Sequence, residues 1–500
     1  MDKVKQNYEE ILELVFKISY LCLSFATFVS VIYISPVQPI LVKLTLALGA
    51  LVILVRVINW KKYRKMPCLI LMILFCLSFL LSTFMNRQYG MTDNLKWILW
   101  TGLQFFALYV CDVERDTEKY RKEFNVIAHL MIIGTAIAAA ASLIMLTQSY
   151  SEFLTTAEGE FIVTGFTWDR LWGVYTDPNY GAVFSVIGVV LSVYFLLRQK
   201  GIKKVLYIIT AILDFGYVIY SDSRTGEIAF VLCTGWLLYF YLIRKGNSAK
   251  DKKQKYIRCL KSILILICIM AVAVGGTSLL KTENIKYQTE VAQKAKVQKS
   301  LQSNKKSKKN TNKKKGTNKK KGTNKKKGTN KKKGTNKKKS EIETARQKNI
   351  ENDATNGRFA LWNSAIEVWE TSPVYGAGYS TFVAYARENV PDTYAVNNDQ
   401  GDYTSMHNAF FNALAFQGGI GFILLILITL RIIQYVFVTV IKEKDKLYLT
   451  AMLAAVGATG ISMMFLLDGL YTNSPSACIL WVFSGYLVQY TYKTRREEKV

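Results

Sequence analysis

Residues 180–198 read YGAVFSVIGVVLSVYFLLR, an apolar run whose only charge is Arg198 at its end. A helix of about 18 or more such residues is long enough to cross the hydrocarbon core of a membrane. The whole chain is 51% hydrophobic, and comparable runs recur along it. They predict about twelve transmembrane helices, so the expected fold class is all-α, a polytopic membrane helical bundle. The expected spans are 12–34, 40–58, 67–85, 95–112, 124–147, 180–198, 205–220, 227–243, 262–280, 420–440, 447–468 and 477–492.

The charges of the connecting loops predict how this bundle is oriented. Alternate loops are basic, and the intervening loops carry few Lys or Arg residues. Because basic loops remain in the cytoplasm, both termini are expected to be cytoplasmic and residues 281–419 extracytoplasmic. The basic segments are 61–65, 121–122, 203–204, 244–261, 442–444 and 493–496.

The spans and the loop between them divide the chain into four expected parts. Residues 1–280 would form spans one to nine of the transmembrane bundle, and residues 420–500 would form spans ten to twelve. Between them lie a Lys-rich disordered repeat, 281–350, and an extracytoplasmic loop, 351–419, in which we expect the chemistry. In that loop Phe359, Trp362, Ile366 and Trp369 recur at helical spacing, which predicts a short amphipathic helix.

Lysine is concentrated in one segment of the predicted external loop. Between Lys281 and Ser340 there are 24 Lys and 2 Glu, including five Thr-Asn-Lys-Lys-Lys units from Thr311 to Lys339. Such a segment repels itself and buries no apolar surface, so it is expected to be disordered. Its external position argues against nucleic acid as a partner and favours anionic wall polymers or lipid headgroups. A tolerated tandem expansion without a function is the simpler interpretation.

Four cationic or titratable side chains fall on the predicted outer segments. Arg170 lies in loop 148–179, Arg224 in the short loop after the seventh span, and Arg358 and His407 in the large loop. Arginine binds phosphate oxygens in a bidentate manner, and the outer side of a membrane protein is normally poor in it. Snorkelling or pairing with a local acid explains each arginine alone, but their joint presence favours an anion-binding site.

His407 is one of 2 histidines in the chain and the one expected outside the bundle. Ser405 is a suitable N-cap for a helix that starts at Met406, which would place His407 in the first turn. The helix dipole favours a neutral imidazole there, as a general base requires, and the free N–H groups would accept a phosphate. Asp402 is close enough in sequence to orient the ring.

Polar residues within the predicted spans are few, and the clearest are His129, Asp214 and Arg431. Asp214 and Arg431 would pair inside the bundle. His129 would form one helix–helix hydrogen bond rather than relay protons. None of the three predicts a proton-coupled transport path.

Several short motifs, taken in order, resemble those of the bacterial O-antigen ligase/polymerase superfamily. Its members are polytopic proteins that act on polyprenyl-diphosphate-linked glycans at the outer face of the cytoplasmic membrane. The matching segments lie within about 165–425, and the lysine repeat departs from the family pattern. They are Arg170-Leu-Trp-Gly, Asp177-Pro-Asn-Tyr-Gly-Ala, Ser223-Arg-Thr-Gly, Gly357-Arg with Trp362, Gly376-Ala-Gly, His407-Asn-Ala-Phe-Phe-Asn-Ala-Leu and Gly418-Gly-Ile-Gly.

The resemblance implies a glycosyltransferase of the bacterial plasma membrane that uses a polyprenyl-diphosphate-linked oligosaccharide and needs no cofactor and no metal. Arg224 and Arg358, and less surely Arg170, would bind the diphosphate. His407 would take the proton of the acceptor hydroxyl as it attacks the anomeric carbon, with inversion. Further diphosphate- or glycan-binding residues would be Asp177, Asn179, Trp362, Tyr379 and Asp402, and Trp168, Trp172 and Tyr403 are additional aromatics that could stack on sugars.

The expected reaction is polymerisation of repeat units into capsule or exopolysaccharide. A ligase that transfers the glycan to a wall or protein acceptor would use the same chemistry and remains an alternative. A flippase or exporter of lipid-linked glycan would need a polar path through the midplane, which few spans offer. Metal-dependent oligosaccharyltransferases resemble one another in paired acids in the first outer loop, whereas residues 35–39 contain no acid.

Overall fold

The computed structural model describes residues 2–155, 161–245, 357–399, 401–443 and 446–498, and within 257–294 it describes 257, 260–264, 267–268, 271, 275–291 and 293–294. The five Thr-Asn-Lys-Lys-Lys units of the predicted repeat lie outside the described residues. Residues 275–291 are helical, so the stretch that was expected to be disordered from 281 begins with a helix. The division of the chain into four parts stays a prediction.

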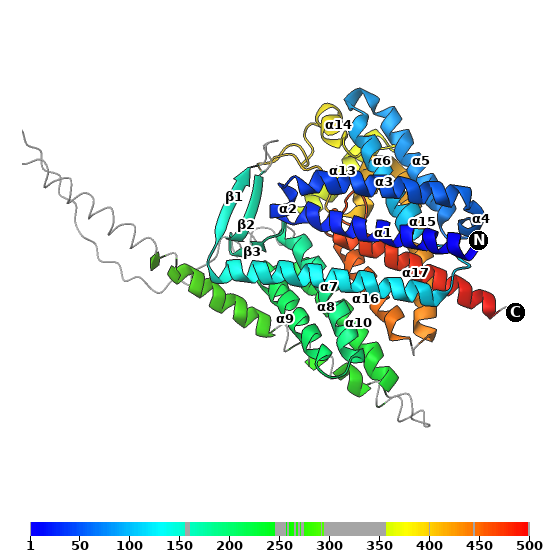
Figure 1. The fold of residues 1–500 in the computed structure, drawn as a ribbon. Coiled ribbons are helices and arrows are strands. Elements are labelled where there is room, and N and C mark those ends of the chain that lie inside the picture. The colour runs from blue at the N-terminus through cyan, green and yellow to red at the C-terminus, as the bar shows by residue number, and fades with distance from the viewer. Residues whose placement is uncertain are drawn as a thin grey trace, which may run out of the picture.

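Long helices make up most of the described chain, which confirms the predicted all-α polytopic bundle (Figure 1). The long helices are α1 (Asp2–Phe28), α3 (Val37–Ile58), α5 (Leu69–Met85), α6 (Thr92–Leu103), α7 (Thr117–Thr147), α8 (Pro178–Arg198), α9 (Lys203–Ser221), α10 (Arg224–Lys245), α15 (Ala409–Lys442), α16 (Leu447–Ser462) and α17 (Pro475–Glu497). The shorter elements are α2 (Ser30–Tyr33), α4 (Trp60–Tyr63), α13 (Arg358–Thr371), α14 (Phe382–Asn389), the 3-10 turn η1 (Arg87–Tyr89) and the π-helical turn η2 (Gln104–Tyr109).

In the described part of the chain, 7 helices are long and apolar enough to cross a membrane, judged by length and composition. They are α1, α3, α7, α8, α9, α10 and α15. The helices α5 and α16 are apolar but shorter, and α6 with η2 and α17 occupy the remaining described spans. Helices therefore lie at every predicted span except 262–280, of which only a part is described, and the count of twelve stays a prediction.

Polar residues followed by proline set the starts of two central helices. Asp177 accepts a hydrogen bond from the backbone N–H of Asn179 and is followed by Pro178 at the first position of α8. Ser474 and Pro475 start α17 in the same way. Such a residue satisfies backbone donors that have no partner inside the helix, and proline there loses no hydrogen bond.

Loop 148–179 departs from the all-α expectation. It forms a three-stranded antiparallel sheet in the order β1 (Ser151–Thr155), β2 (Phe161–Thr167) and β3 (Arg170–Gly173). Aromatic and β-branched residues such as Phe161, Ile162 and Val163 favour a strand, and strand pairing satisfies the backbone polar groups. One face of the sheet buries Ile162 and Leu171 and packs on α7, α8 and α9.

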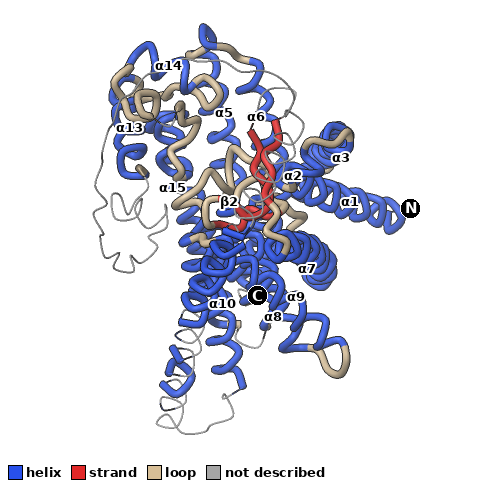
Figure 2. Tube along the Cα trace, turned by 90° about the vertical axis from the view of Figure 1, so that its left-hand side faces the viewer, coloured by secondary structure: helices blue, strands red, loops and turns tan. Residues whose placement is uncertain are grey.

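The bundle has two distinct ends. In Figure 1 the N- and C-termini lie together at the right, and the sheet lies at the left. Figure 2 faces the left-hand end, which we call the sheet end, and the opposite end is the terminal end. An even number of crossings would place both termini at one end, as the loop charges predict.

A buried network of charges joins α1, α3 and α7 toward the terminal end. Glu13 accepts hydrogen bonds from Arg56 at 2.8 Å and from Arg115 at 3.0 Å. Arg115 also donates to Glu123 at 3.0 Å, and the fully buried Lys17 donates to Glu123 at 2.8 Å. Buried charges are tolerated only when each has its partners. The network therefore fixes the first helix against the rest of the bundle.

Replacing Glu13 with Ala is expected to destabilise the protein, because Arg56 and Arg115 would lose the carboxylate that they share. Removing one partner of a buried pair costs about 3–5 kcal/mol. Lys96 and Asp93 form an exposed pair, with side chains 66% and 68% exposed, so Asp93→Asn should cost less than about 1 kcal/mol. Thermal unfolding in detergent measures both variants, and equal shifts of the midpoint would contradict the role of the network.

Candidate functional site

Four helices that carry predicted site residues start next to those residues. Helix α8 follows Asp177, α10 starts at Arg224, α13 starts at Arg358, and α15 follows His407 after one intervening residue. The first backbone N–H groups of a helix have no partner within it, and the helix dipole is positive there. Arg224 and Arg358 therefore add positive charge to helix starts that already favour anions, whereas Asp177 caps the start of α8.

Loop 463–474, between α16 and α17, brings three of these helix starts together. One backbone carbonyl of the loop accepts a hydrogen bond from the side chain of Asn408 at 3.1 Å, and another accepts from the hydroxyl of Tyr180. The guanidinium of Arg358 lies over the Phe465 ring, 5.6 Å from its centroid. Helices α8, α13 and α15 thus contact one loop, for which the sequence analysis predicted no role.

Arg170, at the start of β3, is held by the protein on two sides. Its Nε donates to the backbone carbonyl of Ser221 at 2.9 Å, and its Nη2 donates to Oδ1 of Asn179 at 2.7 Å. Ser221 is the last residue of α9, and Asn179 lies in the first turn of α8. Arg170 therefore ties the sheet to the two helices that flank the candidate site.

The turn that presents Arg224 is also held from outside. Ser223 accepts a backbone N–H of the first turn of α10 at 3.2 Å. Asp222 pairs with Lys281, from the helical segment 275–291, at 2.8 Å, and Lys281 also reaches Glu227 of α10. The position of Arg224 is therefore fixed on both sides of the turn.

Arg358 and His407 act on one another and share the neighbouring carboxylate of Asp177. Burial and the positive charge of Arg224 lower the pKa of Arg358, and the carboxylate of Asp177 opposes this shift. Burial lowers the pKa of His407 below its ordinary value, Arg358 lowers it further, and Asp177 again opposes. The four groups lie close enough for their charges to interact, and the lowered pKa favours the neutral form of His407.

His407 does not lie in the first turn of a helix, so that prediction is wrong. Helix α15 starts at Ala409, and Asn408 is its N-cap, with its side chain accepting from the backbone N–H of Phe410 at 2.9 Å. Ser405 instead accepts the backbone N–H of His407 at 3.3 Å, and His407 has a left-handed φ of 49°. Asn caps a helix as well as Ser does, and Asn408 rather than Ser405 caps α15. Burial and the nearby Arg358 lower the pKa of His407, so a place in the first turn of a helix is not needed for that shift.

Asp402 does not orient the His407 ring, contrary to the prediction. Its carboxylate accepts from Arg387 at 2.6 Å. The edge of the Tyr403 ring meets the imidazole instead, with centroids 6.0 Å apart, and Tyr403 stacks on Tyr394 at 5.9 Å. A direct contact of Asp402 with a substrate stays a prediction.

Two aromatic residues that were predicted to bind glycan lie in different surroundings. Trp362 stacks on Phe411 of α15 with centroids 5.2 Å apart, which holds α13 against the helix that follows His407. Tyr379 packs against Trp97 at 5.3 Å and Tyr471 at 5.2 Å, within the core. The contacts of Trp362 involve α13, the helix that starts at Arg358, whereas those of Tyr379 are packing contacts in the core.

The polar residues inside the bundle have structural partners. His129 lies 2.8 Å from the hydroxyl of Tyr207 and links α7 to α9, as predicted. The expected pair of Asp214 and Arg431 is not formed. Asp214 accepts from Thr135 at 3.0 Å, whereas Arg431 lies on the exposed side of α15.

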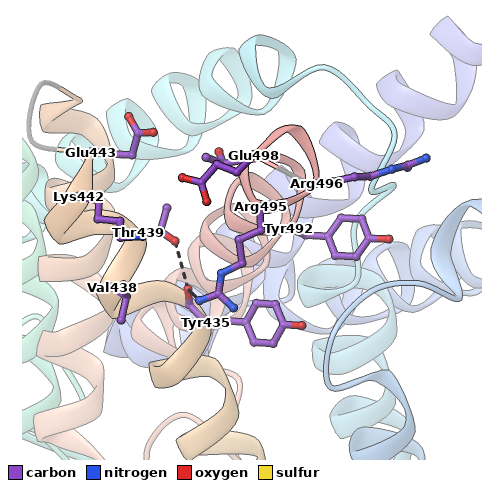
Figure 3. A pocket seen from close by; sticks show the side chains of 10 residues that line it. Tyr435, Val438, Thr439, Lys442, Glu443, Tyr492, Arg495, Arg496 and Glu498 are labelled. Carbon is purple, nitrogen blue, oxygen red and sulfur yellow. Dashed lines mark hydrogen bonds between the residues drawn. The ribbon is translucent and has the colours of Figure 1, made fainter. Parts of the chain in front are cut away.

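A cavity of about 660 Å³ lies at the terminal end, between the last turns of α15 and α17 (Figure 3). Arg496 pairs there with Glu114 at 2.7 Å, and Arg495 donates to the carbonyl of Tyr435 at 3.3 Å, so both arginines have partners in the protein. None of the predicted site residues lines this cavity. Its lining is Tyr435, Val438, Thr439, Lys442, Glu443, Tyr492, Thr494, Arg495, Arg496 and Glu498.

Within the described ranges, no three His, Cys, Asp or Glu side chains are placed to hold a metal ion together. Asp177 is the carboxylate whose charge reaches His407 and Arg358, and it already caps α8. Reaction without a metal stays a prediction.

Residues 209–426 match the family model described as O-Antigen ligase. The match includes Arg224, Arg358 and His407, and it begins after Arg170 and Asp177. It confirms the family resemblance that the motifs indicated. No curated protein matches the chain.

The titration of His407 tests this arrangement of charges. Since the chain has 2 histidines, isotope labelling of histidine gives two NMR signals, which His129→Gln assigns. We expect His407 to titrate below the ordinary histidine value. Arg358→Gln removes a positive charge and should raise the pKa, whereas Asp177→Asn keeps a helix cap, removes a negative charge and should lower it. Identical titration of His407 in the three proteins would contradict the proximity of these groups.

Proposed function

Because this chain belongs to the O-antigen ligase/polymerase superfamily, we propose that it polymerises lipid-linked oligosaccharide repeat units by glycosyl transfer. The donor would be a polyprenyl-diphosphate-linked oligosaccharide at the outer face of the cytoplasmic membrane. The product would be a capsule or exopolysaccharide.

The observation that carries this proposal is that Arg358 lies near a second arginine, Arg224, and also near the buried His407. The guanidinium of Arg224 lowers the pKa of Arg358, so the two positive charges repel one another in a partly desolvated place. A dianionic diphosphate would relieve that repulsion and accept hydrogen bonds from both arginines. The starts of α10 and α13 add their backbone N–H groups to the same field.

His407 would act as the general base. Its neutral imidazole takes the proton of an acceptor hydroxyl, and the hydroxyl oxygen forms a bond to the anomeric carbon of the donor sugar. The bond from that carbon to the diphosphate oxygen breaks, and the polyprenyl diphosphate leaves with the electron pair. Arg224 and Arg358 stabilise the charge that grows on it. A single displacement inverts the anomeric configuration.

Arg170 would act as a positioning residue. Its guanidinium is bonded to Ser221 and Asn179, at the end of α9 and the start of α8. Through these bonds it would set the distance between Asp177 and Arg224, on either side of the diphosphate. The predicted role of Asn179 changes in the same way, from binding the substrate to holding Arg170.

A ligase would use the same donor and the same three residues, and only the acceptor would differ. An exporter would leave the buried His407 beside Arg358 without a role. The external lysine repeat, with its expected anionic partners, stays a prediction outside the described residues.

We expect His407→Ala to reduce polymer formation roughly 100- to 10,000-fold, the usual contribution of a general base. Arg358→Gln and Arg224→Gln should reduce it by at least about 100-fold. Arg87 is the matched control, because it is an exposed arginine whose side chain contacts Phe84 at the end of α5, and Arg87→Gln should be near wild type. Gels of cell-surface polysaccharide and of extracted lipid-linked glycan measure all four variants at equal protein levels.

The pattern on these gels distinguishes the candidate functions. Loss of long polymer, with single repeat units accumulating on lipid outside the cell, supports the polymerase. Polymer of normal length that is no longer attached to its acceptor indicates a ligase. Lipid-linked units that accumulate inside the cell indicate an exporter, and normal polymer in His407→Ala refutes the general base.

A further inference from the structure

Four aromatic side chains form a continuous row on the sheet. Phe153 stacks on Phe161, with ring centroids 5.5 Å apart and planes inclined by 29°. Phe153 also contacts Trp168, with centroids 5.9 Å apart, and Trp168 contacts Trp172 at 5.8 Å. We call Phe153, Phe161, Trp168 and Trp172 the aromatic row.

The register of the strands explains why these rings meet. Phe153 pairs with Val163, two residues beyond Phe161, and side chains two apart on a strand share a face. The register then shifts in the pairing of β2 with β3, which leaves Trp172 opposite no residue. Such a bulge re-aims a side chain, and here Trp172 meets Trp168.

Three members of the aromatic row are exposed and Trp172 is half-buried, although the opposite face of the sheet is buried. The exposed fractions are 48% for Phe153, 64% for Phe161 and 59% for Trp168, whereas Ile162 and Leu171 are 5% and 0% exposed. Burial of the inner face is sufficient to hold the sheet on the bundle. Contiguous exposed aromatic surface is therefore left for a ligand or a membrane.

The aromatic row leads to the candidate active site. Its last member, Trp172, lies on β3 with Arg170, which donates to Asn179 at the start of α8. The backbone carbonyl of Trp172 accepts from the hydroxyl of Tyr217 at 3.0 Å, which fixes this end of the row on α9. A ligand on the row would thus continue toward the arginines.

The position of the sheet favours a ligand over the membrane. Figure 2 shows the strands near the middle of the sheet end, with α13 and α14 to one side and α1 and α3 to the other. Aromatic belts that anchor a protein in lipid surround the side of the bundle instead. Glu152, on β1, and Asp169, beside Trp168, would also repel anionic headgroups.

We propose that the aromatic row binds the glycan chain of the substrate at sugar rings beyond the one that reacts. This rests on the proposed function, because it names where that substrate extends. The C–H faces of sugar rings are apolar and pack on aromatic faces, while their hydroxyls stay free for hydrogen bonds. Ser151, on the same face of β1 as Phe153, and Asp169, beside Trp168, offer polar groups near the rings.

The test measures glycan binding without turnover, in His407→Ala protein reconstituted in nanodiscs. The probe is a set of oligosaccharides of defined length from partial acid hydrolysis of the host's surface polysaccharide, and saturation-transfer NMR gives the Kd. We expect Phe161→Ser with Trp168→Ser to weaken binding roughly tenfold, and Phe161→Tyr with Trp168→Tyr to preserve it. Phe84→Ser is the matched control, since Phe84 is 57% exposed at the end of α5.

A second readout uses the same sheet variants with His407 intact. In the native host, the serine pair should shorten the polymer without abolishing it, since the reacting groups are unchanged. Unchanged affinity and unchanged polymer length in the serine pair would refute the role of the aromatic row. So would failure of the parent protein to bind the oligosaccharides at millimolar concentration, or quenching of Trp168 fluorescence by brominated lipids. Normal polymer in His407→Ala would refute the general base of the proposed function and would leave the binding result standing.

Discussion

The buried carboxylate of Asp468 constrains the loop on which the candidate site depends. Asp468 has no exposed surface and accepts from Ser462 at 2.7 Å and Ser474 at 2.6 Å, at the end of α16 and the start of α17. Ser476 and a backbone N–H complete the set of donors. A buried carboxylate is tolerated only where donors surround it, so loop 463–474 has little freedom to rearrange. Since the starts of α8, α13 and α15 all contact this loop, Asp468 constrains their spacing from a distance.

The buried charges are arranged differently at the two ends of the bundle. Toward the terminal end, Lys17, Arg56 and Arg115 are matched by Glu13 and Glu123 at hydrogen-bonding distances, so the charges stabilise the fold. At the sheet end, the charges of the candidate site include two mutually repelling arginines, and burial adds to the cost. Neighbouring like charges lower the stability of the folded protein, and an anionic substrate would offset that loss when it binds.

The sequence predicted most of the bundle but little of what positions the site. Apolar runs predicted the long helices of the described residues, because the length and composition of a run are local signals. The start of α15 was misplaced because Ser405 and Asn408 are both good caps, and only the tertiary contact of Asn408 with loop 463–474 distinguishes them. That loop was missed because it acts through backbone carbonyls, which no residue type reveals. Asp468 among three serines was the one available signal.

The sheet was missed for a related reason, since strands of four to seven residues leave only a short alternating pattern. The sheet is small, but it positions side chains that contact neighbouring helices. A flexible loop would give Trp168 and Trp172 no defined direction, whereas the strands hold them in one row with Phe153 and Phe161. Arg170 belongs to the same sheet and bonds both α8 and α9. The sheet therefore joins the aromatic row to the start of α8 and the end of α9, next to the candidate site. If the aromatic row binds the glycan as proposed, a bound glycan would press on the same sheet that positions Arg170, and so on the spacing of α8 and α9.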